Sequence, residues 1–439
     1  MKSGQIKALS ALILSSVCGT AGAAGFQLLE QNASGIGNAF AGSAADAENA
    51  SIIYNNPAGM TELQHDHEFS IGAVGIKPNF TFNDSGSSGV SGAGTGGNAG
   101  HWGLVPDAYL AWKLTDRFSL GLGVSAPFGL LTNYSSPWTG SAQSNKFSIT
   151  TYNINPAIAY KVNDAVSLGV GLNYQHFDAD YQRQLSTLTN VPFPSLAAVL
   201  GGTGFLMPGN TPVEAKLSGD AWGWNAGALF KLSPSTKLGL SYRSQLNYNL
   251  TGTLTASGTS AQTNSELSGN IRASVTLPDT AIASITHQLN DHWELLGDVQ
   301  WTGWGKLSSI NLNYTSGALA GQTAQTLNTD FRNTWRIAVG ANYKINDAWK
   351  LKTGLAWDQS PVRGAATRLA SLPDNDRYWV SAGVQYKPTK LSTVDFGVAY
   401  LFMHSAAINN NQSSAGLGTL VGSYNDSGLV VGLQYSQAF

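Results

Sequence analysis

Histidine, serine and acidic side chains are the residues of this sequence that could carry acid–base, nucleophilic or metal chemistry. The seven histidines are scattered, and His65-Asp66-His67 places potential metal ligands close together in the chain. We interpret this stretch as the solvated entrance to a strand, because local spacing alone does not form a metal site. No Gly-x-Ser-x-Gly stretch presents a serine nucleophile at a strand-to-helix turn. We therefore expect no catalytic residue, no metal site and no cofactor, and an enzyme such as a lipase or protease is the weaker alternative.

The low charge content is unusual for a soluble domain. Asp, Glu, Lys and Arg make up 11% of the 439 residues, against roughly 25% in typical soluble proteins. The formal net charge is -2, which gives no indication of the basic patch that nucleic-acid binding favours. We expect no nucleic-acid partner.

The N-terminus has the features of an export signal. Lys2 and Lys7 precede an apolar run over residues 8–14, and Ala21-Gly22-Ala23 fits a small-residue cleavage site. We predict a signal peptide over residues 1–23 and a mature chain that starts at Ala24. Its removal would take away Cys18, the single cysteine, and with it any disulfide or thiolate chemistry.

An exported chain of low charge has two ways to cross a membrane. No later segment has 18 consecutive apolar residues, so membrane-spanning helices are not expected. A closed β-barrel is the other solution, because all its backbone groups pair between strands.

Alternating side chains support a barrel. Apolar residues occupy every second position in several segments, with mainly Gly, Ser, Asn or Gln between them. These segments are residues 118–124, 166–174, 337–343, 380–386 and 396–400. Because strand side chains have a period of two, one face is apolar, which suits lipid, and the other is small or polar, which suits a lumen.

Short turns predict the number of strands. Turn signals recur roughly every 50 to 70 residues, with longer polar stretches between them. The six signals are Thr115-Asp116, Asn163-Asp164, Ser233-Pro234, Asn290-Asp291, Asn346-Asp347 and Lys387-Pro388. Outer-membrane barrels alternate short inner turns with long outer loops, so six inner turns predict about 14 strands. The amphipathic last strand ends at Phe439, which is typical of outer-membrane proteins.

Tryptophans near the predicted strand ends suggest aromatic girdles at the two membrane interfaces. They are Trp222, Trp224, Trp301, Trp304, Trp349 and Trp379. The alternative for any one of them is an ordinary buried aromatic residue.

The segment before the first strand is predicted to be a plug. Residues 24–65 lack strand signals, whereas residues 66–439 carry them. In "SIIYNNPAG" (residues 51–59), Pro57 fixes φ, biases Asn56 towards an extended conformation, and is followed by Gly59, which permits a left-handed exit. Such rigidity has no use in a loose tail, so we favour a compact plug inside the lumen.

One predicted outer loop is unusually apolar. Residues 191–207 break the alternation, and Pro194 suits the first turn of a short helix. Leu196, Val199 and Leu200 would share one face of that helix. A contiguous apolar patch on an external loop indicates a binding surface; the alternative is packing against the barrel rim.

Several motifs, in order, resemble the FadL-type long-chain fatty-acid transporters. They are AGFQ (24–27), SGIG (34–37), AAD (44–46), NPA (56–58), WGWNAG (222–227), LSYRS (240–244), DVQWT (298–302), SPV (360–362), LPD (372–374) and the terminal Phe439. The resemblance covers nearly the whole mature chain. It implies an all-β fold, a transmembrane antiparallel barrel of 14 strands, with an N-terminal hatch inside the lumen that carries Asn56, Pro57 and Ala58.

The resemblance also implies a route for the ligand. In the family, the substrate leaves sideways at an inward kink in the third strand, and outer-loop helices form a capture groove. Pro127 has no N–H for the ladder and Gly129 adds freedom, so we predict the kink there; alternatively, the ladder simply ends. Pro156 in the next strand would face the same breach. The groove residues would be Phe193, Leu196, Val199, Leu200, Phe205 and Leu206.

A fatty acid needs a cation for its carboxylate, because burying an unpaired charge is costly. The family has an arginine at the position that corresponds to Arg183, at the outer end of the fifth strand, so we expect Arg183 to fill this role. Lys306 does not align clearly with the lysine ligand of the family, and we interpret it as a solvated charge at the barrel rim. We interpret Arg243 as a residue that orients a polar network in the lumen.

We therefore predict passive uptake of long-chain fatty acids by a monomer in the bacterial outer membrane, with lipid and a hydrophobic small molecule as partners. The alternatives are the same scaffold moving aromatic hydrocarbons such as toluene, for which no cation is needed, and a general porin, which would need an open and charged lumen.

Overall fold

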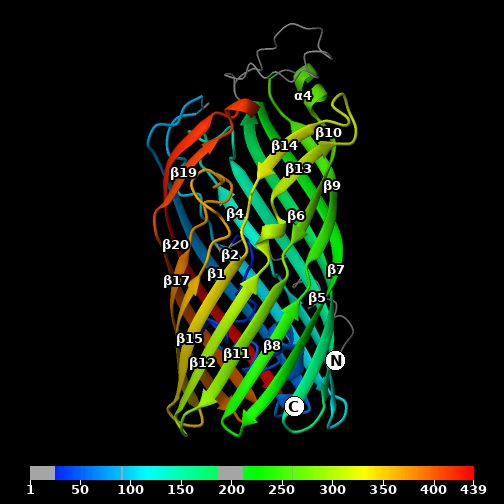
Figure 1. Cartoon of the computed structure of the whole chain (residues 1–439), viewed down its shortest axis with the longest axis vertical. Coiled ribbons are helices and arrows are strands. Elements are labelled where there is room, and N and C mark those ends of the chain that lie inside the picture. The colour runs from blue at the N-terminus through cyan, green and yellow to red at the C-terminus, as the bar shows by residue number, and fades with distance from the viewer. Residues whose placement is uncertain (1–24, 90–91, 186–210, 260) are drawn as a thin grey trace.

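The computed structural model describes residues 25–89, 92–185, 211–259 and 261–439, most of which form one sheet (Figure 1). Its strands are β1 (His67–Asp84), β2 (Gly103–Lys113), β3 (Phe118–Ser125), β4 (Gly129–Asn133), β5 (Lys146–Lys161), β6 (Val166–Leu185), β7 (Thr211–Ser233), β8 (Thr236–Arg243), β9 (Leu246–Ala256), β10 (Gly269–Leu277), β11 (Thr280–Gln288), β12 (Trp293–Thr302), β13 (Ser309–Tyr314), β14 (Thr323–Asn328), β15 (Thr334–Lys344), β16 (Trp349–Asp358), β17 (Arg377–Thr389), β18 (Ser392–Met403), β19 (Ala406–Asn411) and β20 (Thr419–Ala438). The helical elements are η1 (Ile36–Asn38), α2 (Ile52–Asn55), η2 (Pro57–Glu62), α4 (Ala261–Leu267), η3 (Trp304–Lys306) and η4 (Ser413–Ala415). Among the described residues, no helix is long and apolar enough to cross a membrane.

These segments form a closed antiparallel barrel of 14 strands, as predicted. Six of the 14 are broken in two, namely β3/β4, β8/β9, β10/β11, β12/β13, β14/β15 and β18/β19, so 20 segments make 20 − 6 = 14 strands. The barrel closes where β1 pairs with β20, from Glu68↔Ala438 to Asp84↔Gly422. Because the sheet is closed, no edge strand exposes unpaired backbone N–H and C=O groups to the bilayer.

The six predicted turns all lie at one end of the barrel, the lower end in Figure 1. Five lie where the sequence placed them. The sixth is shifted, because β17 continues through Pro388 to Thr389 and the chain reverses at Lys390 and Leu391. Short turns face the periplasm in outer-membrane barrels, which orients the molecule.

Four of the strand breaks lie at one height. Arg243 pairs with Thr280, Thr280 with Thr302, and Thr302 with Thr334, and each of these residues borders a break. This row divides the wall into a lower part, next to the turns, and an upper part, next to the long loops.

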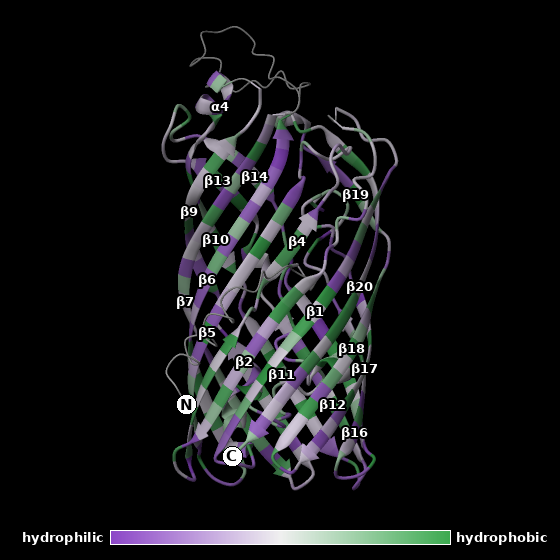
Figure 2. Cartoon of the chain, turned by 180° about the vertical axis from the view of Figure 1, so that it is seen from behind, coloured by the Kyte–Doolittle hydropathy of each residue, from purple (hydrophilic) through white to green (hydrophobic). Residues whose placement is uncertain are grey.

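The two parts have opposite polarity. In the lower part, outward side chains are apolar and exposed, such as Leu351 and Leu355, while inward ones are small or polar. In the upper part of β7, Val213 and Leu217 face inward and are buried, while Glu214 and Lys216 face outward. Figure 2 shows the alternation of hydrophobic and hydrophilic residues along the strands. The sequence prediction of a polar lumen is therefore correct for the lower part and wrong for the upper part.

The exposed tryptophans mark the limits of the lower, lipid-facing part. Trp222 and Trp224 lie on the outward face near the breaks, and Trp349 lies near the turns. Trp304 and Trp379 are exceptions to the predicted girdles, because both are fully buried. Trp304 belongs to η3 inside a strand break, and Trp379 faces inward, where it packs against Phe40.

Residues 25–66, called the hatch from here on, lie inside the lower part of the barrel (Figure 1). The hatch contains no strand, and the helical turns η1, α2 and η2 are its regular elements. Most of its side chains are buried against the inward faces of the strands.

Candidate functional site

Asn56 connects two segments of the hatch to each other and to the barrel wall. Its backbone is extended (φ -153°, ψ 100°), and Pro57 starts η2 directly after it. Its side-chain Nδ2 donates to Ala44 O (2.7 Å) and to Ala228 O of β7 (3.0 Å), and its Oδ1 accepts from the Ala58 N–H (3.1 Å). Asn56 is fully buried, so the loss of these bonds would leave buried polar groups unpaired.

Glycines of the wall permit this close approach. A Cβ at Gly227 would lie 2.0 Å from Asn56 Oδ1, and one at Gly354 would lie 2.1 Å from the Asn38 carbonyl carbon. Inward glycines therefore make room for the hatch backbone. Gly59 differs from expectation: it adopts no left-handed conformation, and its role is to pack closely on Ile52, since a Cβ would lie 2.3 Å from Ile52 Cγ1.

Ion pairs hold the other side of the hatch. Glu48 contacts the ammonium groups of Lys350 and Lys352 on β16, at 2.7 Å for Lys352, and Lys352 also lies 3.2 Å from Asp395. Burial alone would raise the pKa of Glu48, but the two lysines outweigh it and hold the pKa well below its usual range. The carboxylate is therefore ionised and tightly paired.

The predicted kink coincides with the break between β3 and β4, at residues 126–128. The first residues of the hatch, 25–31, called the tip below, run alongside it. Leu28 N donates to Pro127 O (2.8 Å), Gly129 N donates to Phe26 O (2.8 Å), and Gln31 Nε2 donates to Ala126 O (2.9 Å). The tip thus satisfies backbone groups that a neighbouring strand would otherwise pair.

The wall is discontinuous at this point. The β2–β3 ladder reaches the pair Ala108↔Val124 and does not extend to residues 103–107 of β2, while β4 pairs with β5 on its other side. Asp107 faces inward beside this discontinuity and is buried, and neither of its carboxylate oxygens has a hydrogen-bond partner among the described residues.

Pro156 in the next strand was predicted to face the same breach, but it lies away from residues 126–128. It lies opposite Leu122 of β3, and the β5–β6 register omits Asn155 and Pro156. The Asn155 side chain donates to Leu172 O of β6 (2.6 Å), in place of the N–H that proline lacks.

Arg183 lies near the outer end of β6, the fifth strand, in the upper part of the lumen. It is 8% exposed and borders a cavity of about 40 Å³ that is lined mainly by apolar residues, including Val213, Leu254, Leu267 and Tyr314. Its Nη1 has no hydrogen-bond partner among the described residues. A guanidinium in such surroundings is poised for an anionic group.

One buried apolar cluster connects this cavity with the kink. It contains the cavity residues Val213, Leu254 and Tyr314, and it continues to Phe26 of the tip and Phe128 of the kink. Phe26 packs edge-on against Trp304, with ring centroids 4.8 Å apart.

Other predicted residues lie elsewhere. Lys306 is half-exposed and pairs with Asp279 (2.9 Å) and Gln245 (2.7 Å), away from the Arg183 cavity. Arg243 donates to Tyr54 O of the hatch (2.8 Å) and stacks on the Tyr54 ring. The predicted groove residues, Phe193, Leu196, Val199, Leu200, Phe205 and Leu206, lie outside the described residues, as does the predicted signal peptide.

Sequence reasoning missed Asp374, which fixes the start of the hatch. Its Oδ2 accepts from Gly25 N (3.0 Å) and from Ser360 Oγ (2.6 Å), and its Oδ1 pairs with Arg377 (3.0 Å). The LPD motif contains this residue, but only the fold shows what it contacts, 349 residues from Gly25.

These features define a class: a plugged outer-membrane barrel with an apolar upper lumen and a break in its wall. The family model "Outer membrane protein transport protein (OMPP1/FadL/TodX)" matches residues 14–439, so the chain belongs to this family of outer-membrane transport proteins. A long-chain fatty acid transport protein from Salmonella typhi is 31% identical over 424 residues, covering 92% of this chain and 93% of that one.

Solved structures agree with this assignment. A Pseudomonas aeruginosa FadL homologue superposes with a TM-score of 0.85 at 25% identity, covering 95% of this chain and all of that one. The Pseudomonas putida toluene transporter TodX superposes with a TM-score of 0.71 at 18% identity, over 95% of this chain and all of that one, and so shares the fold.

Proposed function

We propose that this protein takes up long-chain fatty acids by passive diffusion across the outer membrane. The carrying observation is the buried apolar cluster that runs from the Arg183 cavity to the strand break at residues 126–128. An acyl chain matches the apolar side chains of this cluster, which would have to move apart to admit it, and its carboxylate matches the guanidinium. The 31% identical relative named a long-chain fatty acid transport protein supports the same substrate class.

The ligand's route has graded affinity. Full burial of an acyl chain of about 16 methylenes would contribute up to about 12 kcal/mol at ~0.8 kcal/mol each, which would trap it. The apolar loop predicted over residues 191–207 captures the ligand weakly, the Arg183 cavity, with about 40 Å³ of space, holds its carboxylate, and the break releases it. No step uses nucleotide energy.

Release is lateral and requires the tip to move. Phe26 and Leu28 occupy the break through the backbone bonds of the tip to Pro127 and Gly129. When the tip leaves, the gap between β2 and β4 opens beside the apolar cluster. The Asn56–Pro57–Ala58 turn and the Glu48 ion pairs keep the rest of the hatch in place.

Uptake by cells that lack their own fatty-acid uptake protein tests the proposal. We expect cells expressing this chain to accumulate labelled oleate, and Arg183→Ala to reduce uptake by about tenfold or more, through loss of a charge-assisted contact. Arg183→Lys should restore part of it. Arg272→Ala, which removes an exposed outward guanidinium from β10 in the same upper part, is the matched control.

Toluene uptake, measured in the same cells, separates the two substrate classes. The proposal expects toluene accumulation to be insensitive to Arg183→Ala. It is wrong if the unmodified chain takes up toluene but no oleate, or if Arg183→Ala reduces toluene uptake alone. A large, steady open-state current in a planar bilayer would instead indicate a general porin.

A further inference from the structure

An outward-facing hollow lies in the upper part of the wall, outside the proposed transport path. Its volume is about 410 Å³, within the range of small-molecule sites. Four adjacent strands line it, β5, β6, β7 and β9, which pair in that order (Figure 1). We call this hollow the outer patch and define it by the outward side chains that line it: Ser148, Thr150, Asp178, Asp180, Lys216, Ser218, Thr251 and Thr253. They alternate with inward side chains such as Ile149 and Leu217, which are buried.

Four hydroxyl groups of the outer patch are not used by the protein itself. They form no side-chain hydrogen bond with any described residue, and they belong to Ser148, Ser218, Thr251 and Thr253. The outer patch therefore offers several free donors and acceptors at one place.

Polar groups elsewhere on the upper outward face bond each other instead. Across β9 and β10, Ser274 Oγ donates to Asn249 Oδ1 (3.1 Å) and Thr276 Oγ1 donates to Asn247 Oδ1 (2.9 Å). The free hydroxyl groups of the outer patch thus differ from those of the neighbouring strand pair.

The charged side chains of the outer patch already have partners. The pairs are Asp180 with Lys146 (2.6 Å), Asp178 with His176 (3.3 Å) and Lys216 with Glu214 (2.9 Å). No ammonium group of the patch is therefore left over for a phosphate. Free hydroxyl groups among paired charges match an uncharged ligand with many hydroxyl groups of its own, such as a sugar.

The height of the outer patch above the membrane interface also fits a sugar headgroup. Tyr174 and Trp222 pack on the outward face with ring centroids 5.1 Å apart, and such aromatic residues mark the interface. Ser218 is four residues above Trp222 on β7, which is about 13 Å along the strand and about 10 Å in height at a tilt of about 40°. A phospholipid headgroup layer is only about 5–8 Å deep, so the patch lies beyond it, at the level of a larger headgroup.

We propose that the outer patch binds the sugar headgroup of a glycolipid in the outer leaflet. The hydroxyl groups of Ser218, Thr251 and Thr253 exchange hydrogen bonds with those of the sugar. The acyl chains lie on the outward face below, along exposed Ile154 and Leu172. The proposal is independent of what the barrel transports.

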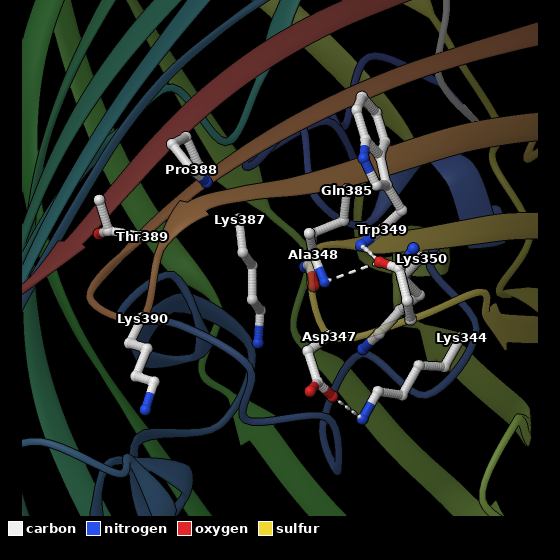
Figure 3. A pocket seen from close by; sticks show the side chains of 11 residues that line it. Lys344, Asp347, Ala348, Trp349, Lys350, Gln385, Lys387, Pro388, Thr389 and Lys390 are labelled. Atoms are coloured by element: carbon white, nitrogen blue, oxygen red, sulfur yellow. Dashed lines mark hydrogen bonds and ion pairs between the residues drawn. The ribbon is translucent and has the colours of Figure 1, made fainter.

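A second hollow, at the turn end of the barrel, provides a control. Its volume is about 610 Å³, and its lining includes Lys344, Lys350, Lys387 and Lys390. Figure 3 shows the Lys387 and Lys390 side chains pointing to the opposite side from the Trp349 ring, which lies on the lipid-facing side. These lysines therefore do not face the lipid.

Native mass spectrometry of the full chain in detergent, titrated with dioleoyl lipids, tests the proposal. Galactosyl diacylglycerol should bind about tenfold more tightly than phosphatidylglycerol, which has the same acyl chains. Ser218→Ala/Thr251→Val/Thr253→Val should lower the galactolipid affinity to the phosphatidylglycerol level, because it removes three hydroxyl groups at nearly constant shape. Ser274→Ala/Thr276→Val removes outward hydroxyl groups that already bond asparagines, and should keep the preference.

The proposal is overturned if the unmodified chain binds both lipids equally, or if the triple variant keeps the preference. Loss of the preference in Lys387→Gln/Lys390→Gln would place the sugar at the turn end and would also overturn it. Methyl galactoside in about hundredfold excess should leave the galactolipid bound, because the acyl chains supply most of the affinity; displacement would indicate a site for soluble sugars instead. Heat-modified gel mobility verifies that each barrel is folded, and Thr251→Val alone replaces the triple variant should it not fold.

Discussion

At the scale of single residues, the hatch is fixed by a few buried polar side chains. Asn56 is the clearest, because one amide group bonds the hatch turn, the hatch segment at Ala44 and the wall at Ala228. The sequence predicted the rigidity of this turn from Pro57 and its neighbours. The partners could not be predicted, because they depend on where β7 passes in three dimensions.

Asn56→Ala should loosen the hatch without unfolding the barrel. The lost bonds and the unpaired Ala228 carbonyl should cost about 2–4 kcal/mol of hatch docking. Hydrogen exchange of hatch amides should therefore accelerate, while exchange in β16 and β17 stays unchanged. Asn55→Ala, at the neighbouring position, should have little effect; equal acceleration in both variants would contradict the assigned role.

Glu30 predicts a pH dependence at the tip. Its carboxyl group is fully buried. Burial raises the pKa of Glu30 to about 7; the nearby backbone N–H groups of Glu30 and Leu29 and the attraction of Arg377 oppose this shift, and repulsion from Asp358 adds to it. Because the pKa of Glu30 is higher when the tip is docked than when it is free, the docked tip binds more protons. Docking of the tip therefore weakens as the pH rises from about 4.5 to 7.

Protection factors of amides in residues 26–31, measured between pH 5 and pH 8, should show this effect. They should fall as the pH rises, with an upper limit of about 3 kcal/mol from the size of the pKa shift. Glu30→Gln should flatten the profile, because the amide does not titrate. A profile that is the same in Glu30→Gln would mean that another group is responsible.

At the scale of elements, broken strands and close contacts carry the function. The sequence predicted the third-strand break from Pro127 and Gly129, because proline cannot donate to a ladder. It did not predict the breaks at residues 244–245 and 303–308, where no proline interrupts the pattern, nor the break at residues 278–279, although Pro278 lies in it. The breaks at residues 244–245 and 303–308 lie at the height where the polarity of the wall changes, which is a property of neighbouring strands together.

Gly354→Ala should displace η1 from the wall. The added Cβ would lie 2.1 Å from the Asn38 carbonyl carbon, and this overlap should cost about 1–3 kcal/mol. Faster hydrogen exchange at residues 36–40 is the expected result. Gly364→Ala, where a Cβ meets nothing within 4 Å, should leave exchange unchanged. Normal protection of η1 in Gly354→Ala would show that the hatch backbone can shift at no cost.

At the scale of the whole molecule, the barrel consists of a lower and an upper part, and the hatch fills the lower part. Strand number, closure and the turn end were predictable, since they need only a period of two and turn residues. The inverted polarity of the upper part was not predictable from the sequence. A period of two shows that the two faces of a strand differ, but it does not show which face points inward. The Arg183 cavity depends on that inversion, since it places Val213 and Leu254 inside.

In the proposed route, the ligand leaves through the break only when the tip moves out of it. Gln27 and Phe128 form a bridge pair, flanked by the bonds Leu28 N→Pro127 O and Gly129 N→Phe26 O. This is the non-hydrogen-bonded type of antiparallel pair, with Cα atoms about 4.5 Å apart, within the range of a disulfide.

The most direct measurement is therefore oleate uptake by a Gln27→Cys/Phe128→Cys variant, before and after reduction. With the disulfide formed, uptake should fall to the level of cells without the protein, and reductant should restore it. Each single cysteine variant should transport under both conditions. Full uptake with the disulfide verified as intact would contradict release through the β3/β4 break.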